Sequence, residues 1–227
     1  MKILQFMIIN LSHQILKTLP YWLIKFLSFP IGIIYFLITF RSSFRLYKRK
    51  DLFNNSGLFY NPLLVKINYT RYWLETLWLT NRNFKKYISP YIEIENQNFV
   101  NKLKKQYPGL IFALPHQGNW EFAIPIGNSI NLNLLAVAEP LDNSYVLNWF
   151  KSLRESLGIE IIIGGKGQNT FDSLVEKLNS GKDICLLSER SIKKSGVATD
   201  FFGQLAAFPK GPVALSFKTG VPIIPTT

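Results

Sequence analysis

The stretch LIFALPHQGNWEF, Leu110 to Phe122, is the part of the chain from which its fold is most readily inferred. Its opening residues, LIFALP, form an apolar run with the length of a buried strand. Gly118 and Asn119 follow as a turn, and either residue is suited to cap a helix that begins directly afterwards. The stretch therefore predicts a strand, a turn and a helix, with His116 at the carboxyl end of the strand.

His116 is one of only two histidines in the chain, and it precedes the carboxylate Glu121 by five residues. On a regular helix this spacing would point the two side chains about 140° apart. They can meet only if His116 lies in the turn and Glu121 folds back from the first helical turn, a bend that Gly118 permits. An imidazole whose second nitrogen is bonded to a carboxylate can act as a general base. If a substrate supplies a hydroxyl group, such a base can deprotonate it for direct attack on a thioester. The alternative is a histidine that caps a helix beside a surface glutamate.

Apolar runs alternate with stretches of helical length from about residue 108 onward. These runs are residues 110–115, 133–138, 159–163, 183–187 and 221–225. The alternation predicts a layered α/β core with a mainly parallel sheet flanked by helices. Sites in such sheets form at the carboxyl ends of strands. His116, Glu139 and Glu189 all fall at such ends.

The first forty residues contain the evidence for a membrane. Apolar residues recur at helical spacing between residues 3 and 19, and Tyr21 to Phe40 is almost wholly apolar, interrupted by Lys25, Ser28 and Pro30. This second segment has the length of a bilayer span, but the lysine and the proline argue against one. Attachment in the membrane interface is therefore preferred, and a spanning helix and an intramolecular apolar layer remain as alternatives.

A basic cluster follows the apolar segments and suits an anionic cytoplasmic membrane surface. It consists of Arg41, Arg45, Lys48, Arg49 and Lys50. A solvated helical face is the alternative interpretation. We place a domain boundary here, with a membrane-associated helical region over residues 1–56 and the α/β core over 57–227.

Composition excludes several classes of protein. The formal net charge of +12 implies acidic partners such as lipid headgroups or the phosphates of coenzyme A. A single cysteine, Cys185, cannot form an internal disulfide, and with two histidines it does not supply a familiar zinc site. The basic cluster adjoins apolar segments instead of being interleaved with aromatic residues, so we expect no nucleic acid partner.

Four blocks of the sequence together resemble one protein family. HQGNWE resembles the histidine and acidic motif of the glycerolipid acyltransferase superfamily, in the branch that contains the lipid A and the phosphatidylinositol mannoside acyltransferases. YTRYWLE at residues 69–75, AVAEPLDN with FKSLRESLGIEII within 136–162, and the block from SERSIKKSG to GVPIIP within 188–225 occur in the family's order and spacing. The resemblance covers the chain from about Tyr69 onward.

The resemblance assigns roles to particular residues. It implies that the catalytic residues are His116, Glu121 and Glu189. It implies that the residues contacting polar parts of the substrates are Glu139, Arg154, Asn119 and Arg190. It also implies that the residues giving apolar surface to the acyl chain are Phe201, Phe202, Leu205 and Phe208. Packing in the core is the alternative for each aromatic residue taken alone.

The resemblance also implies a reaction and a place for it. We expect a long acyl chain to pass from acyl-coenzyme A, or from a carrier-protein thioester, to a hydroxyl of a phosphatidylinositol mannoside, without a cofactor or a metal. The expected location is the cytoplasmic face of a bacterial inner membrane. The alternatives are a lipid A lauroyl or myristoyl acyltransferase and a non-catalytic acyl-binding or lipid-binding module. Family members continue beyond the position of Thr227, so a fragment or a shortened, inactive form is also expected.

Overall fold

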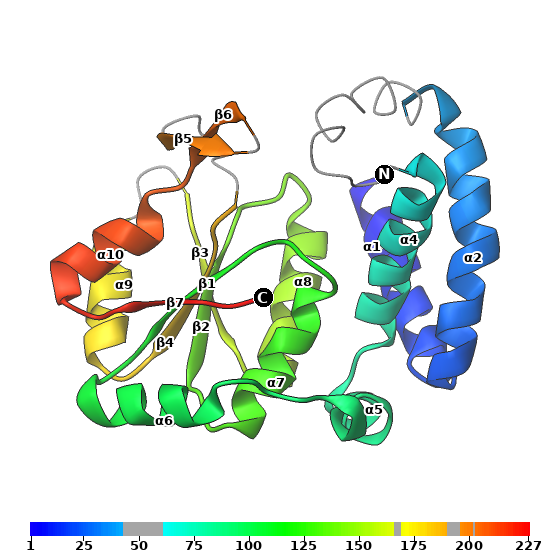
Figure 1. Ribbon diagram of the computed structural model, residues 1–227. Coiled ribbons are helices and arrows are strands. Elements are labelled where there is room, and N and C mark those ends of the chain that lie inside the picture. Colours follow the sequence, from blue (N-terminus) through cyan, green and yellow to red (C-terminus); the bar gives the residue numbers. More distant parts are fainter. Residues whose placement is uncertain (43–60, 166–168, 190–195, 202) are drawn as a thin grey trace. The chain divides into compact units, whose positions relative to one another are not determined.

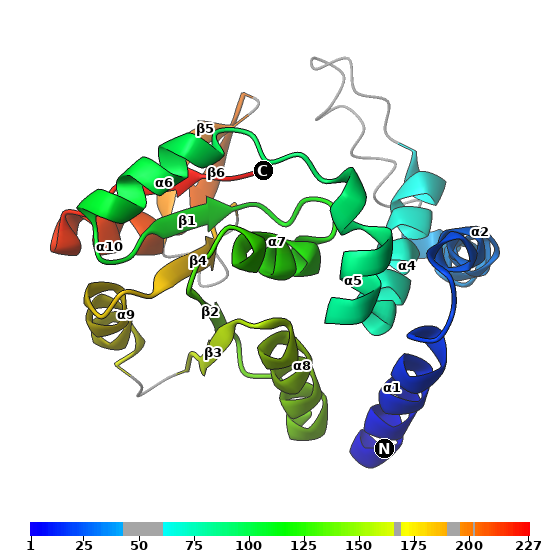
Figure 2. The same cartoon turned by 90° about the horizontal axis from the view of Figure 1, so that it is seen from below.

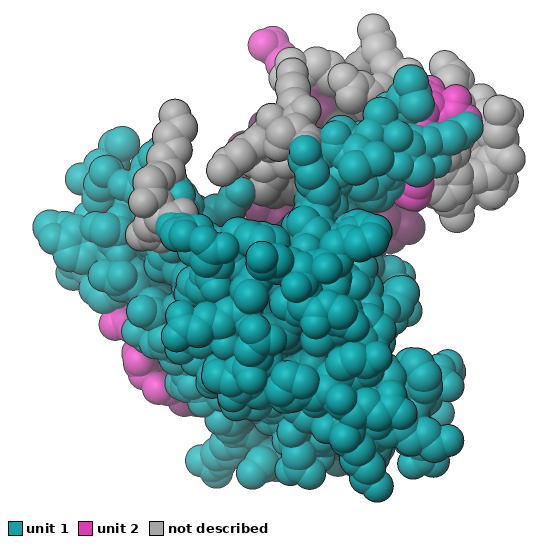
Figure 3. Space-filling model, turned by 90° about the vertical axis from the view of Figure 1, so that its left-hand side faces the viewer, with its two compact units in different colours: residues 1–7, 80–200, 205–227 teal, residues 8–79, 201–204 magenta. Residues whose placement is uncertain are grey.

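The computed structural model describes residues 1–42, 61–165, 169–189, 196–201 and 203–227 (Figure 1). The chain divides into two compact units, which Figure 3 colours separately. The first unit contains residues 1–7, 80–200 and 205–227, and the second contains residues 8–79 and 201–204. The expected domain boundary after residue 56 and most of the basic cluster, from Arg45 to Lys50, lie outside the described residues.

A five-stranded sheet forms the centre of the first unit. Its strand order is β3-β2-β4-β1-β7, and every neighbouring pair is parallel. The strands are β1 (Ile111–Leu114), β2 (Leu134–Ala138), β3 (Glu160–Ile163), β4 (Asp183–Leu187) and β7 (Ile223–Pro225). Each falls within one of the apolar runs in the sequence, so the predicted parallel α/β core is confirmed. A separate two-stranded sheet, which the sequence did not predict, pairs β5 (Val197–Phe201) with β6 (Gln204–Phe208).

Helices cover both faces of the sheet, as Figures 1 and 2 show. The helices of this unit are α5 (Asn81–Tyr87), α6 (Gln97–Gln106), α7 (Ala123–Ser129), α8 (Ser144–Leu157), α9 (Thr170–Asn179) and α10 (Gly211–Thr219), with short 3₁₀ turns η3 (Ser89–Tyr91) and η4 (Trp120–Phe122). Alternate side chains of each strand point to opposite faces. Ile111 and Ile184 therefore pack with α9 and α10, whereas Phe112 packs with α6.

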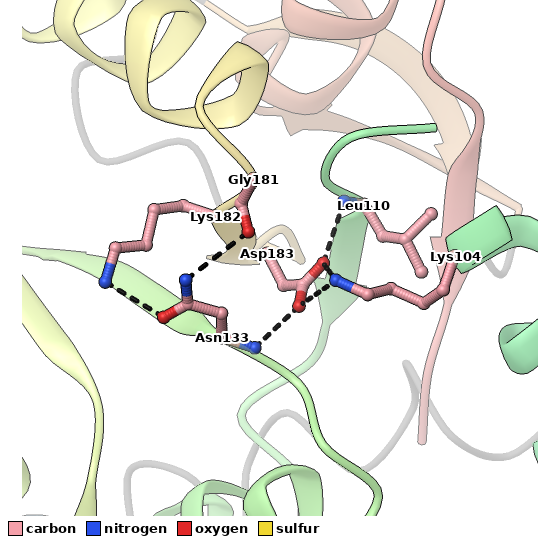
Figure 4. Close-up of polar contacts among 6 residues, drawn as sticks. All are labelled: Lys104, Leu110, Asn133, Gly181, Lys182 and Asp183. Carbon is pink, nitrogen blue, oxygen red and sulfur yellow. Dashed lines mark hydrogen bonds and ion pairs between the residues drawn. The ribbon is translucent and has the colours of Figure 1, made fainter. Parts of the chain in front are cut away.

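Asp183 joins the amino-terminal ends of three strands (Figure 4). Its fully buried carboxylate accepts hydrogen bonds from the backbone N–H groups of Leu110 and Asn133, at 3.0 and 2.7 Å. The Lys104 ammonium group of α6 lies 3.0 and 2.9 Å from the two carboxylate oxygens. Because a buried charge needs both a counterion and hydrogen bonds, these contacts account for an aspartate in the interior. The cluster stabilises the amino-terminal end of the sheet, whereas the predicted site lies at the carboxyl end.

Glu160, at the start of β3, forms a second and more exposed ionic cluster. Lys177 of α9 donates to it at 2.7 Å, and Lys182 lies 2.9 Å from its other oxygen. Hydrogen bonds from Lys177 and then from Lys182 lower the pKa of the Glu160 carboxyl below its ordinary value. The cluster ties α9 to the start of β3.

The second unit is built around the packing of α2 (Tyr21–Ile38) against α4 (Pro62–Trp78). Gly32 makes this packing close, because a Cβ atom at its position would lie 2.7 Å from the Ile67 Cα atom. Near the other end of the pair, Glu75 is buried, and its carboxylate accepts hydrogen bonds from the Tyr21 hydroxyl and the Arg71 Nε, both at 2.8 Å. A glycine contact and a polar cluster thus hold the two helices together.

Helices α1 (Lys2–Leu16) and α2 expose large apolar side chains. On α2, Trp22, Phe26 and Leu37 are 67%, 62% and 64% exposed. Among the described helices, α2 alone is long and apolar enough to cross a bilayer, a property that it shares with core helices of soluble proteins and with signal sequences. The exposed side chains agree with the apolar pattern of the sequence.

Candidate functional site

The residues between β1 and α7 form the turn that the sequence predicts. Gly118 has φ +58°, a left-handed conformation that glycine adopts readily. The Asn119 side chain accepts a hydrogen bond from the backbone N–H of Glu121 at 3.2 Å and so caps the short turn η4. The chain then enters α7. The predicted strand, turn and helical start are confirmed, with Asn119 as the cap.

The register of the sheet brings His116 and Glu189 together. Leu114 and Leu187, the last residues of β1 and β4, are paired, and the Ser188 N–H donates to the Leu114 carbonyl at 2.8 Å. His116 and Glu189 each lie two residues beyond this pair, and the His116 Nδ1 contacts the Glu189 Oε1. Both side chains are about one-third exposed. The contact leaves Nε2 of the ring as the nitrogen available for proton transfer.

Trp120 also contacts the histidine. Its ring lies edge to face with the His116 ring, with 4.8 Å between the centroids and 82° between the planes. The imidazole is therefore held by the Glu189 carboxylate and by the Trp120 indole. No role was predicted for Trp120 beyond its place in the HQGNWE motif.

Glu121 is paired with an arginine. Its carboxylate, fully buried, accepts hydrogen bonds from the Arg154 Nε at 3.0 Å and the Arg154 Nη2 at 2.7 Å. Arg154 projects from α8 and is 23% exposed. The expected contact between Glu121 and the His116 ring is therefore not made. Instead, η4 turns the Glu121 side chain into the interior, where the Arg154 guanidinium balances its charge.

A cavity of about 110 Å³ lies beside this ion pair. Its walls come from η4, α7, α8 and the strands β1, β2, β3 and β4. Glu121 and Arg154 are its only charged lining groups among the described residues, and the rest of the lining is apolar apart from Cys185. Burial raises the pKa of the Cys185 thiol to about 12, so the group is a neutral thiol. The cavity can hold a small apolar group beside a fixed guanidinium.

The other predicted site residues have no described contact with the His116–Glu189 pair. Glu139 follows β2 directly and is exposed, one residue beyond Ala138 in the cavity wall. Arg190 and Phe202 lie outside the described residues. Phe201 and Leu205 of the β5–β6 sheet are 52% and 83% exposed, and their role toward an acyl chain stays a prediction.

No group of three or more histidine, cysteine, aspartate or glutamate side chains that could hold a metal ion occurs in the part of the chain that the structure describes. The described side chains of the site offer an imidazole paired with a carboxylate, next to a buried ion pair and an apolar cavity. Such a pair can accept a proton from a hydroxyl group.

Comparison with known families identifies one to which the chain belongs. Residues 66–227 match the bacterial lipid A biosynthesis acyltransferase family, and the matched part includes every residue of the site. The chain belongs to this family. Family membership and the parallel fold confirm the resemblance that the sequence blocks indicated.

The chain is also similar in sequence to individual curated acyltransferases. The chain is 32% identical over 161 residues to a phosphatidylinositol mannoside acyltransferase of Mycobacterium tuberculosis, covering 70% of this chain and 51% of that protein. It is 32% identical over 162 residues to the phosphatidylinositol mannoside acyltransferase of Mycolicibacterium smegmatis, covering 70% and 52%. The chain thus spans about half the length of the curated relatives that it matches.

Proposed function

We propose that the protein transfers a long acyl chain from an acyl thioester to a hydroxyl group of a glycolipid at a membrane surface. The observation that supports this most directly is the His116–Glu189 pair at the carboxyl edge of the sheet. A carboxylate at Nδ1 fixes the tautomer that presents Nε2 as a base and stabilises the imidazolium that forms. The family to which the chain belongs supports acyl transfer as the reaction.

The proposed reaction proceeds in two steps. In the first, Nε2 of His116 takes the proton of the acceptor hydroxyl while the hydroxyl oxygen bonds to the thioester carbonyl carbon, giving a tetrahedral oxyanion. In the second, the carbonyl re-forms, the carbon–sulfur bond breaks, and the departing sulfur takes the proton from the imidazolium. The products are an ester and a free thiol. The Glu189 carboxylate stabilises the transient positive charge on the ring.

The buried pair of Glu121 and Arg154 has a different proposed role. Its geometry supports an ion pair that holds the guanidinium on the cavity wall, where Arg154 can face a polar part of a substrate. Glu139 and Asn119, together with Arg190, are proposed to contribute polar contacts from the surrounding loops. Glu121 then acts on the substrate through Arg154 and not through the imidazole.

We propose a phosphatidylinositol mannoside as the acceptor and acyl-coenzyme A as the donor. The acceptor is supported by the names of the mycobacterial relatives, and the net charge of +12 favours the phosphates of the donor and anionic membrane lipids. The exposed apolar surface of α1 and α2 supports attachment to a membrane, which we propose to be the cytoplasmic face of a bacterial inner membrane. A lipid A precursor is the second candidate acceptor, favoured by the name of the matched family.

The test compares the two histidines of the chain. His116→Ala should lower thiol release from acyl-coenzyme A in the presence of acceptor lipid by about 10²- to 10⁴-fold, the usual contribution of a general base. His13 is the matched control, because its Nδ1 contacts the Leu77 carbonyl at 2.8 Å within the second unit, so His13→Ala should retain turnover. Full activity of His116→Ala would exclude the proposed base, and no thiol release by the unaltered chain would favour a binding module.

A further inference from the structure

The first turns of α1 are attached to the loop that follows β2. Lys2 Nζ donates to the Asp142 carbonyl at 2.6 Å. The Asn143 Nδ2 donates to the Lys2 carbonyl at 3.0 Å and to the Gln5 Oε1 at 2.9 Å. All of these residues belong to the first compact unit. We call residues 2–7 the strap, because three hydrogen bonds fasten it to this loop.

Asn143 has a second function in the same place. Its Oδ1 accepts a hydrogen bond from the Tyr145 N–H at 3.2 Å and caps the amino terminus of α8. The Tyr145 ring also contacts the strap, 6.0 Å from the Phe6 ring centroid. One asparagine therefore orders both the first turn of α8 and its attachment to the strap.

The loop and helix held by the strap contribute to the candidate site. Glu139 opens the loop directly after the cavity-lining residue Ala138, and α8 carries Arg154 on the cavity wall. Movement of the strap would therefore displace Glu139 and Arg154, which are proposed to contact polar parts of the substrates.

The other side of the strap is apolar and exposed. Ile3, Leu4 and Met7 are 56%, 59% and 59% exposed. Residues 1–40 contain no aspartate or glutamate, while Lys2, Lys17 and Lys25 are basic. A segment that has exposed apolar side chains and contains basic but no acidic residues suits the surface of an anionic bilayer.

We propose that the strap is a membrane-docking element whose contact with an anionic bilayer orders the loop over residues 139–143 and the first turn of α8. Ile3, Leu4 and Met7 enter the apolar layer, and the hydrogen bonds of Asn143 transmit their immobilisation to the loop. The effect on turnover rests on the proposed function, whereas docking and ordering of the loop do not.

Hydrogen exchange of the full chain tests the ordering directly. The amides of residues 139–147 are followed with and without vesicles of phosphatidylcholine and phosphatidylglycerol. We expect these amides to exchange about tenfold more slowly with vesicles, within the usual range for coupled sites. The triple variant Ile3→Gln, Leu4→Gln, Met7→Gln should lose this protection.

Matched variants separate the strap from general effects. Val213→Gln with Phe217→Gln removes exposed apolar side chains of α10 and should keep the protection. Asn143→Ser keeps a capping oxygen for α8 but removes the amide donor to the strap, so the protection should disappear. Asn81→Ser removes a similar amide hydrogen bond, to the Ser156 carbonyl at the other end of α8, and this variant should keep the vesicle-induced protection.

Two outcomes would overturn the proposal. One is vesicle-induced protection of residues 139–147 in Asn143→Ser equal to that of the unaltered chain. The other is protection that depends on protein concentration without vesicles, which would identify a second copy as the partner of the strap. Thiol release is measured in parallel: loss of vesicle stimulation in Asn143→Ser is expected, while absence of turnover in all samples would contradict the proposed function and leave the exchange result valid.

Discussion

The two carboxylates of the candidate site should affect different properties when they are neutralised. Glu121→Gln removes one charge of a fully buried ion pair and leaves Arg154 without its counterion. Removing one partner of such a pair typically destabilises a protein by about 3–5 kcal/mol. Because Arg154 is 23% exposed and glutamine still accepts one hydrogen bond, we expect the lower end, about 3 kcal/mol. For a chain of this length the thermal midpoint would fall by about 6–12 °C.

Glu189→Gln should give the opposite result. Glu189 and His116 are both about one-third exposed, so their pair contributes at most about 1 kcal/mol to stability after solvent screening. The expected fall in thermal midpoint is below about 4 °C. Turnover should fall by about 10²-fold or more, because the imidazole loses the group that fixes its tautomer.

Circular dichroism of purified full-length variants measures the thermal midpoint, and thiol release measures turnover. The double variant Glu121→Gln with Arg154→Met is the control for stability. It leaves no unpaired charge, so it should recover most of the loss caused by Glu121→Gln. If Glu121→Gln kept its thermal midpoint while losing turnover as completely as Glu189→Gln, Glu121 would act on the imidazole and the assignment of the two carboxylates would be wrong.

Three further predictions concern the fold. Glu160→Gln should lower the free energy of unfolding at neutral pH by about 1 kcal/mol or less, since the cluster is partly exposed. Because the pKa of the Glu160 carboxyl is lowered in the folded state, the difference in unfolding free energy between this variant and the unaltered chain should shrink as the pH falls below about 4. Urea denaturation at a series of pH values measures this difference, and a pH-independent difference would contradict its ionic origin. Gly32→Ala should push α2 away from α4 and lower the free energy of unfolding by about 1–3 kcal/mol, measured by thermal denaturation. Gly211→Ala is the control, because a Cβ atom there meets no atom within 4 Å, and it should leave stability unchanged. Equal effects of the two substitutions would refute the close-packing argument. Asp183→Asn should cost about 3–5 kcal/mol in urea denaturation, compared with little for Glu155→Gln in an exposed helical pair, and a small effect would show that the carboxylate is dispensable.

The sequence predicted the sheet well because its strands are buried on both faces and therefore appear as continuous apolar runs. The β5–β6 sheet was missed for the converse reason: β5 is exposed along its whole length and has no apolar face to mark it. The turn after β1 was predictable from Gly118 and Asn119, whose local preferences suit a bend and a cap.

The partners within the site were harder to predict. Glu189 was found through the resemblance, but its contact with His116 depends on β4 being the neighbour of β1, which is a property of the strand order. The pair of Glu121 and Arg154 joins residues 33 positions apart on different elements, and nothing in the local sequence indicates it. Sequence proximity favoured a contact between His116 and Glu121 that the direction of η4 does not make.

The position of β4 has a consequence for how the chain folds during synthesis. Strands β1 and β2 are consecutive in the sequence but are not paired, since β4 lies between them. As the polypeptide leaves the ribosome, the facing edges of β1 and β2 stay unpaired until residues 183–187 have emerged. Unpaired strand edges invite association with other chains, and pairing between strands distant in sequence is slow. Newly made protein should therefore depend on chaperones until its central strand is inserted.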